Sequence, residues 1–402
     1  MLDIWPALPL IINSEEVSTG SVDNIVAALE CSDRVCHISL WTDTILDCET
    51  FLAAMQQPFP ELTNLKFRWG YRINDTVVVP DSFLGGFAPR LENLLLSRVP
   101  FPGLPKLLLS TTHLVTLELL NVPHSGYFSP DAMVAALSTL TDLEYFRLEF
   151  ESPESCPDLE TRRLPPSTRF VLPVLQYFLF KGVIEYFEDL VTDIDAPQLG
   201  HLRIIFFNDI LFDTPQLIRF VSRSPISSAL EKAHISLGDK VGCVTFRSQR
   251  YGSLKLKVSI LCEGLDWQLS SLEQVCTSCL PFLSTSEDLY IHEHPGPQPD
   301  WKDNIANRAW LELLRPFTAL KDLYISEKFA LRGIGLALRK LVEGGATEVF
   351  PTLKRIYLEG LESSGPVQEV IGQLVAARQV SSNPVIISRW ASPKEDKTRI
   401  FG

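Results

Sequence analysis

Residues 350–360, FPTLKRIYLEG, contain the pattern that decides the fold. Three apolar side chains, Leu353, Ile356 and Leu358, follow an apolar-x-x-apolar-x-apolar spacing, and Pro351 lies two residues ahead of the first. We refer to this spacing as the apolar triplet. Clear copies recur at Leu62/Leu65/Phe67, Leu91/Leu94/Leu96, Leu114/Leu117/Leu119, Leu143/Phe146/Leu148, Leu175/Phe178/Phe180, Leu199/Leu202/Ile204 and Leu320/Leu323/Ile325.

The interval between copies identifies the kind of repeat. From Leu62 to Leu199 neighbouring copies begin roughly 23–32 residues apart, and Leu320 and Leu353 are 33 residues apart. Most of these intervals lie near the ~20–29-residue period of leucine-rich repeats. The alternating stretch SLKLKVSIL, residues 253–261, adds a further predicted strand. Weaker copies extend the series at Val35/Ile38/Leu40, Leu230/Ala233/Ile235, Leu289/Ile291 and Val385/Ile387.

Proline marks the predicted boundary between helix and strand in several repeats. Pro60, Pro89, Pro173, Pro197 and Pro351 each lie two residues before the first position of a triplet. Proline cannot continue a helix, and it favours extended backbone in the residue before it. Each of these prolines therefore predicts the point at which a strand begins.

Helix signals fill the intervals between strands. Ser129-Pro130 and Thr214-Pro215 each offer an N-cap residue followed by proline at the first helical position. Residues 331–345 end in two glycines, a plausible helix end, and residues 365–380 have an amphipathic helical pattern. Strands and helices are thus expected to alternate along the chain.

The predicted fold is α/β: an irregular leucine-rich-repeat solenoid, or horseshoe, with parallel strands on the concave face and helices on the convex face. One strand–helix unit cannot bury its apolar face alone, whereas stacked units share a continuous core. We expect an N-terminal cap with a helix at residues 1–34, the solenoid over 35–390, and a disordered charged tail at 391–402.

Composition excludes several classes of partner. The formal net charge of −13 argues against nucleic acid and against an anionic membrane surface, since both require clustered Lys and Arg. The N-terminal stretch carries Asp3, Pro6 and Pro9 and lacks a basic start, so it is a poor secretory signal. Eight cysteines without such a signal predict reduced thiols and a cytoplasmic or nuclear location.

No motif nominates a catalytic, cofactor or metal site. Cys276 and Cys279 form a C-x-x-C pair, but they share one apolar helical face and are interpreted as buried hydrophobes. His292 and His294 lie beside Glu293. A metal site needs a third ligand in ordered geometry, which this short pattern does not supply. We therefore predict a protein that is not an enzyme and that uses no cofactor or metal.

The repeat register instead predicts a binding surface. Side chains alternate along a strand, so the residue between the second and third triplet positions faces away from the core. That position holds Tyr290, Tyr324 and Tyr357 in successive repeats, and Arg147 and Arg203 earlier in the chain. Two positions earlier, Tyr145 and Tyr177 form an aromatic pair, followed by His201.

Two interpretations of these residues remain open. Tyrosine and arginine are enriched at the energetic centres of protein interfaces, so the residues are candidates for a partner-binding concave face. Alternatively, the tyrosines stack on one another or are covered by a loop or the C-terminal tail. The candidate partner-binding residues are Tyr290, Tyr324, Tyr357, Tyr145, Tyr177, Arg147 and Arg203.

Several longer stretches resemble fungal F-box proteins with degenerate leucine-rich repeats. These are WPALPLII, SVDNIVAALECSDRVCHISLW, FFNDILFDTPQLIRFVSRSP, LDWQLSSLEQVCTSCLPFLSTSEDLYI and GPVQEVIGQLVAARQV…NPVIISRW. In that family an N-terminal F-box binds the Skp adaptor of a cullin-type ubiquitin ligase, and the repeats select the protein to be ubiquitylated. Here the F-box motif is missing, because Leu8-Pro9 is followed by LIINSEEV and the first triplet already begins at Val35.

The resemblance implies a non-enzymatic protein-binding module, similar to the substrate-recognition repeats of an F-box subunit. A protein ligand would lie on the concave face, and a Skp-type adaptor is expected as a partner only if an F-box lies upstream. The alternative is an F-box-less leucine-rich-repeat scaffold that has no connection with ubiquitylation.

Overall fold

The computed structural model describes most of the chain, in two compact units. Described residues are 8–14, 22–70, 77–155, 169–207, 214–228, 231–247, 255–279, 281–294, 307–326, 350–359 and 384–390, with positions 372, 373, 375, 376 and 379. Unit 1 comprises residues 1–207 and 215–225, and unit 2 comprises residues 208–214 and 226–402. Each unit is a mixed α/β structure built on a largely parallel sheet.

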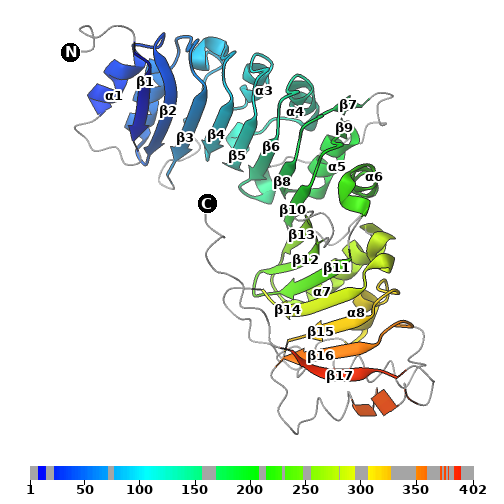
Figure 1. Cartoon of the computed structure of the whole chain (residues 1–402). Helices are drawn as coiled ribbons and strands as arrows, with labels where there is room; N and C mark the ends of the chain where they lie inside the picture. The colour runs from blue at the N-terminus through cyan, green and yellow to red at the C-terminus, as the bar shows by residue number, and fades with distance from the viewer. Residues whose placement is uncertain are drawn as a thin grey trace. The chain divides into compact units, whose positions relative to one another are not determined.

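Unit 1 contains eight neighbouring strands that are all parallel, in the order β1-β2-β3-β4-β5-β6-β8-β10 (Figure 1). The order in space follows the order in the chain, as stacked repeats require. A separate short pair joins β7 and β9 in parallel. The bounds are β1 Leu10–Ser14, β2 Val35–Thr42, β3 Asn64–Trp69, β4 Asn93–Ser97, β5 Thr116–Val122, β6 Tyr145–Phe150, β7 Phe170–Val171, β8 Tyr177–Gly182, β9 Ile194–Asp195 and β10 His201–Phe207.

Helices connect the strands of unit 1, and α3 to α6 form a row along one side of the sheet (Figure 1). The expected proline starts are confirmed: α4 begins at Pro130, and the Ser129 hydroxyl accepts the backbone N–H of Ala132 at 3.2 Å. Helix α6 begins at Pro215. The bounds are α1 Val22–Leu29, α2 Ile45–Ala54, α3 Leu104–Leu108, α4 Pro130–Leu137, α5 Ile184–Thr192 and α6 Pro215–Arg223.

The three positions of the apolar triplet have the same place in the structure of each repeat. In β3, Leu65 and Phe67 point into the core and are fully buried. The first position, Leu62, precedes the strand in a tight turn, where its backbone N–H donates to the carbonyl of Phe59 at 3.2 Å. The backbone N–H groups of the equivalent leucines donate in turns of the same kind; these are Leu91, Leu114, Leu143, Leu199, Leu320 and Leu353.

Backbone hydrogen bonds repeat from one strand to the next just before each strand begins. The carbonyl of Glu144 accepts the amides of both Gln176 and Tyr177, and the carbonyl of Gln176 accepts those of Gly200 and His201. In unit 2 the carbonyl of Glu287 likewise accepts two consecutive amides, those of Lys321 and Asp322. This recurring contact sets the register between neighbouring repeats.

Unit 2 contains seven neighbouring strands in the order β13-β12-β11-β14-β15-β16-β17. Strands β11, β14, β15, β16 and β17 are parallel, and α7 and α8 contact each other beside them (Figure 1). The bounds are β11 Lys232–Leu237, β12 Val241–Arg247, β13 Lys255–Leu261, α7 Leu265–Gln274, β14 Asp288–Glu293, α8 Asn307–Leu314, β15 Asp322–Ile325, β16 Arg355–Glu359 and β17 Ile386–Trp390.

The prediction of parallel strands throughout is wrong at the start of unit 2. Strand β12 was not anticipated, and it pairs in antiparallel fashion with both β11 and β13. The three residues from Gly238 to Lys240 reverse the chain between β11 and β12, and the Gly238 amide donates to the carbonyl of Val241 at 2.9 Å. The predicted strand near residues 254–260 exists as β13, but it completes a meander instead of a repeat.

The structure tests some of the remaining fold predictions and leaves others untested. The N-terminal region contains α1 as expected, and it also contains β1, which pairs in parallel with β2. The horseshoe curvature and the boundaries of the predicted solenoid stay predictions. The expected helix at 331–345, most of that at 365–380 and the tail at 391–402 lie outside the described residues. None of the helices within the described ranges has the length and hydropathy that a membrane span requires.

A buried carboxylate joins two consecutive helices of unit 1 and provides a test of the repeat packing. Glu188 of α5 accepts the backbone N–H groups of Gln216 and Leu217, both at 2.8 Å, in the first turn of α6. We expect Glu188→Ala to lower the free energy of unfolding by about 2 kcal/mol or more, since charged acceptors at a helix start contribute this much. Urea unfolding followed by circular dichroism measures the loss.

The matched control for Glu188 is Glu185→Ala. Glu185 belongs to the same helix but is exposed, so its removal should change the free energy of unfolding by less than about 0.5 kcal/mol. Equal effects of the two substitutions would contradict the assigned role of Glu188.

Candidate functional site

Four aromatic side chains stack on successive strands of unit 2. His234 on β11 and Tyr290 on β14 have ring centroids 4.4 Å apart and planes 9° from parallel. Tyr290 and Tyr324 are 4.2 Å apart at 7°, and Tyr324 and Tyr357 are 4.4 Å apart at 4°. We refer to His234, Tyr290, Tyr324 and Tyr357 as the aromatic ladder.

The strand register produces the ladder directly. Backbone pairing places His234 opposite Tyr290, Tyr290 opposite Tyr324, and Tyr324 opposite Tyr357. Neighbouring strands lie about 4.8 Å apart, which is close to the distance at which aromatic rings stack. Because the triplet residues beside them point into the core, the ladder lies on the opposite face of the sheet. All four side chains are half-buried.

Ion pairs lie beside the ladder on the same face of the sheet, two residues earlier on each strand. Arg355 binds the carboxylate of Asp322 through two hydrogen bonds, of 2.6 and 2.5 Å. Its guanidinium carbon also lies 5.7 Å from the centre of the Tyr357 ring, within the range of a cation–π contact. Lys232 and Asp288 form a looser pair at 3.6 Å. These contacts restrict the ring of Tyr357 and keep the charges beside the ladder balanced.

One ladder residue, Tyr324, is held neutral by its surroundings. Burial raises the pKa of Tyr324 well above its ordinary value, and the neighbouring Tyr290, which forms a hydrogen bond with it, adds to the effect. A hydroxyl that keeps its proton remains a hydrogen-bond donor throughout the physiological range. Tyr324 thus presents a neutral hydroxyl group within the ladder.

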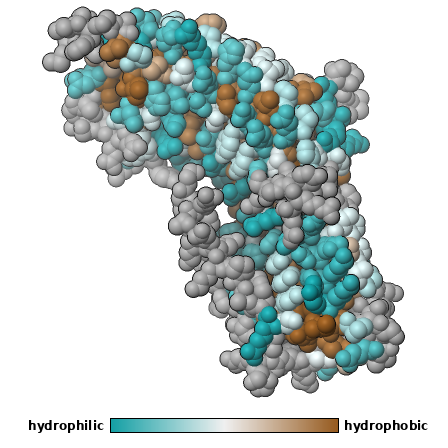
Figure 2. Space-filling view, in the orientation of Figure 1, coloured by the Kyte–Doolittle hydropathy of each residue, from teal (hydrophilic) through white to brown (hydrophobic). Residues whose placement is uncertain are grey.

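The ladder ends beside exposed apolar side chains. The register places Tyr357 opposite Ser388 on β17, so no aromatic ring follows it on the next described strand. Ile386, two residues earlier on β17 and on the same face, is 62% exposed. Figure 2 shows apolar atoms gathered over the last strands of unit 2. The Tyr357 end therefore combines an aromatic ring, an arginine and an aliphatic side chain.

A second, smaller stack lies in unit 1. Tyr145 and Tyr177 are 4.4 Å apart at 4°, and Tyr177 and His201 are 6.0 Å apart at 30°. Burial and the neighbouring Tyr177, which forms a hydrogen bond with it, raise the pKa of Tyr145 to about 12. The expected aromatic pair is confirmed as a stacked pair of rings. Whether its surface binds a partner stays a prediction.

The two predicted arginines of unit 1 differ in their surroundings. Arg147 forms an ion pair with Glu149 at 2.8 Å and lies 3.6 Å from Glu118, so its charge is compensated on its own sheet. Arg203 is exposed and forms no ion pair within the described part of the chain. Arg203 is therefore the better placed of the two for contact with another molecule.

Three residues of the unit 2 site were not among the binding residues predicted from the sequence. His234 occupies the same repeat position as the tyrosines, and that shared position was the available signal. Asp322 and Arg355 lie two residues before Tyr324 and Tyr357, on the same face of the sheet. Opposite charges at equivalent positions of adjacent repeats could have indicated their pairing.

The residues considered for metal or redox chemistry do not assemble into a site among the described residues. Cys276 is buried, as expected, and the side chain of Cys279 lies outside the described part of the chain. The Nδ1 atom of His292 lies 3.1 Å from the carbonyl oxygen of Glu293. No group of three or more potential metal ligands occurs in the described ranges.

Comparison with known proteins identifies no family for this chain. No protein-family model matches it, and no curated protein matches it. Among solved structures, the leucine-rich-repeat-containing protein LegL7 from Legionella pneumophila is similar over 80% of this chain and 93% of that chain. The identity is 10% and the TM-score is 0.30, which are too low for this likeness to indicate a function.

The raised pKa of Tyr145 predicts how stability changes at high pH. Tyrosine in the unfolded chain titrates near pH 10, and Tyr145 in the folded chain titrates near pH 12. Its contribution to stability is therefore fully present below pH 10 and is lost as the pH rises to about 12. We expect the wild-type protein to lose stability relative to Tyr145→Phe across this interval. Urea unfolding from pH 8 to 12 measures the difference, and parallel curves above pH 10 would contradict it.

Proposed function

We propose that this chain is a protein-binding repeat module whose partner contacts the aromatic ladder. The observation that supports the proposal is the stacked column of His234, Tyr290, Tyr324 and Tyr357 on the face opposite the core. Apolar side chains explain the fold of each repeat, but stacking of the units does not require aromatic residues on this face. The ladder is therefore a feature beyond what the fold needs.

The stacked rings are preorganised for binding. Each inner ring is held between two neighbours, so its side-chain rotation is already restricted before a partner arrives. Ordering a free side chain on binding costs about 0.5–1.5 kcal/mol, and this cost is reduced for rings held in place. Tyrosine also combines a large apolar area with a hydroxyl, which suits the centre of an interface.

The Tyr357 end is the proposed centre of contact. The strand register pairs Tyr357 with Ser388 instead of with another aromatic residue, and Tyr357 lies beside Arg355 and near the exposed Ile386. An aromatic or aliphatic side chain of a partner can continue the stack there. Aromatic pairs contribute about 0.5–1.5 kcal/mol beyond the area that they bury.

The double variant Tyr324→Ala/Tyr357→Ala tests the proposal. We expect proteins captured by the wild-type chain from its own cells to bind the variant at least about 30-fold more weakly, as loss of an interface centre predicts. Quantitative mass spectrometry identifies the captured proteins, and calorimetry with the purified partner measures the affinity.

The matched control is Trp267→Ala, which removes an exposed aromatic side chain of unit 2 that lies outside the ladder. This control should leave the same partner bound, and circular dichroism should show both variants folded. If the ladder variant unfolds, the tyrosines are structural. If it is folded and keeps every partner at wild-type affinity, the ladder is not the binding surface.

We further infer that the captured partner is a protein selected for ubiquitylation. This inference depends on the resemblance to fungal F-box proteins with leucine-rich repeats, and on the alternation of strands and helices that such repeats require. A Skp-type adaptor is proposed as a partner only where an F-box precedes these repeats. The alternative function is that of a scaffold that has no connection with ubiquitylation.

Purification of the native protein from its own cells separates the two functions. In the ligase role, a Skp-type adaptor should co-purify in near-stoichiometric amount with both the wild-type protein and the Tyr324→Ala/Tyr357→Ala variant. The targets should be depleted only from the variant, because adaptor and target use different surfaces. A native protein that retains its partners but lacks the adaptor would establish the scaffold function instead.

A further inference from the structure

The sheet of unit 1 carries an excess of basic side chains on the face opposite the core, although the net charge of the whole chain is −13. Residues of this face alternate with buried neighbours, as Lys66 does with Leu65 and Phe67. On the described strands β3 to β10 of the eight-strand sheet, the face holds five basic side chains and two carboxylates. They are Lys66, Arg68, Arg147, Lys181 and Arg203, with Glu118 and Glu149.

Strand register places the two ends of this basic surface in one column. Lys66 on β3 and Arg203 on β10 occupy equivalent positions, and the register between them is continuous. They are five strands apart, and neighbouring strands lie about 4.8 Å apart, so about 24 Å separates the two positions. An extended peptide covers this distance in about seven residues, because each residue advances about 3.3 Å.

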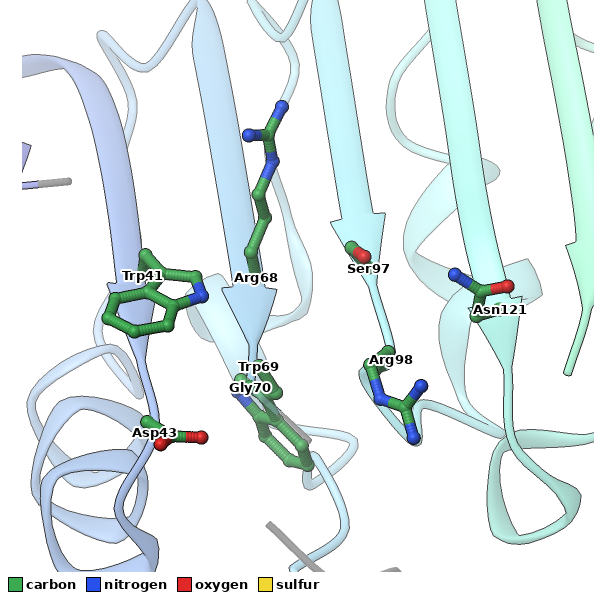
Figure 3. A pocket seen from close by; sticks show the side chains of 8 residues that line it. All are labelled: Trp41, Asp43, Arg68, Trp69, Gly70, Ser97, Arg98 and Asn121. Carbon is green, nitrogen blue, oxygen red and sulfur yellow. The ribbon is translucent and has the colours of Figure 1, made fainter. Parts of the chain in front are cut away.

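Two basic side chains lie together at the β3 end. Figure 3 shows the Arg68 guanidinium directed back along β3, the direction in which Lys66 lies, and away from the strand-end pocket that Asp43 lines. Within the described residues, neither Lys66 nor Arg68 forms an ion pair. Burial and the positive charge of Lys66 both lower the pKa of His37 on the neighbouring strand β2. The positive charge at this end is therefore available to a partner.

Two further basic side chains lie at the β10 end. Arg203 is exposed and forms no ion pair within the described part of the chain. Lys181 is opposite Glu149 in register, but the carboxylate of Glu149 is bound to Arg147 at 2.8 Å. The Nζ atom of Lys181 instead lies 5.4 Å from the centre of the Phe207 ring. Among the described residues, neither cation at this end has a bound carboxylate.

The middle of the column is balanced in charge. Arg147 is bound to Glu149 and lies 3.6 Å from Glu118. These two carboxylates would repel the evenly spaced phosphates of a nucleic-acid strand that crossed the column. A peptide that carries acidic residues at only two places can lay neutral residues over the middle. The stacked rings of Tyr145 and Tyr177, two residues earlier on their strands, offer it a neutral surface there.

We propose that this face of unit 1 binds an acidic peptide segment of a partner protein, with two groups of carboxylates about seven residues apart. One group contacts Lys66 and Arg68, and the other contacts Lys181 and Arg203. The segment crosses the strands in an extended conformation. The proposal does not depend on the aromatic ladder, because all of its residues belong to unit 1.

Two peptides of equal length, charge and composition test the spacing. The spaced peptide is Glu-Glu-Gly-Ser-Gly-Ser-Gly-Glu-Glu, and the clustered peptide is Glu-Glu-Glu-Glu-Gly-Ser-Gly-Ser-Gly, both acetylated, amidated and labelled with the same fluorophore. We expect the full chain to bind the spaced peptide at least about threefold more tightly, because the clustered peptide reaches only one basic group at a time. Fluorescence anisotropy at low salt measures both affinities, since such contacts are least screened there.

Two double variants assign the preference to this face. Lys66→Gln/Arg68→Gln removes one basic group, Lys181→Gln/Arg203→Gln removes the other, and each should abolish the preference for the spaced peptide. The matched control is Arg90→Gln/Lys106→Gln, which changes the net charge equally. Arg90 and Lys106 are exposed in unit 1 and pair with Glu61 and Asp81, outside the face. This control should keep the preference.

Three results would overturn the proposal. Equal affinity of the wild-type chain for the two peptides would show that the two basic groups do not act together. A preference that survives in both double variants would place the binding elsewhere on the chain. An oligothymidylate that binds more tightly than the spaced peptide, and loses this affinity in either double variant, would identify a nucleic-acid strand as the ligand instead.

Discussion

The structure depends on the backbone contact that joins each repeat to the next. A carbonyl just before one strand accepts two consecutive amides of the following repeat, as Glu287 does for Lys321 and Asp322. This contact brings equivalent positions of neighbouring parallel strands into line. A residue type that recurs at one position therefore becomes a continuous column, whether it is leucine in the core or tyrosine on the opposite face.

Much of the fold could be predicted because the apolar triplet is periodic. Leu65 and Phe67, like Leu323 and Ile325, are buried where the spacing placed them. The direction of β12 and β13 could not be predicted in the same way, because alternation along a strand is the same for parallel and antiparallel partners. The short link through Gly238, Asp239 and Lys240 was the available signal, since parallel strands need a longer crossover.

The position of the candidate site was predictable, and stacking of its tyrosines was one of the two interpretations, but its ion pairs were not predictable. Repeat register placed Tyr290, Tyr324 and Tyr357 in one column, and the structure shows their rings stacked. The ion-pair partners of Arg147 could not be predicted from the strand register. Its partner Glu149 lies on its own strand and Glu118 lies on the preceding strand, β5, so the choice between them and an external partner depends on side-chain conformation.

The two ends of the ladder differ, and this difference gives the site a direction. Beyond His234 the register continues to Thr245 and Lys257 on the antiparallel meander, so that end borders polar side chains. Beyond Tyr357 it continues to Ser388, beside the exposed Ile386. An apolar side chain loses more contact with water at the second end than at the first. A partner that follows the column is thus expected to place its most apolar residue against Tyr357 and its polar residues toward His234.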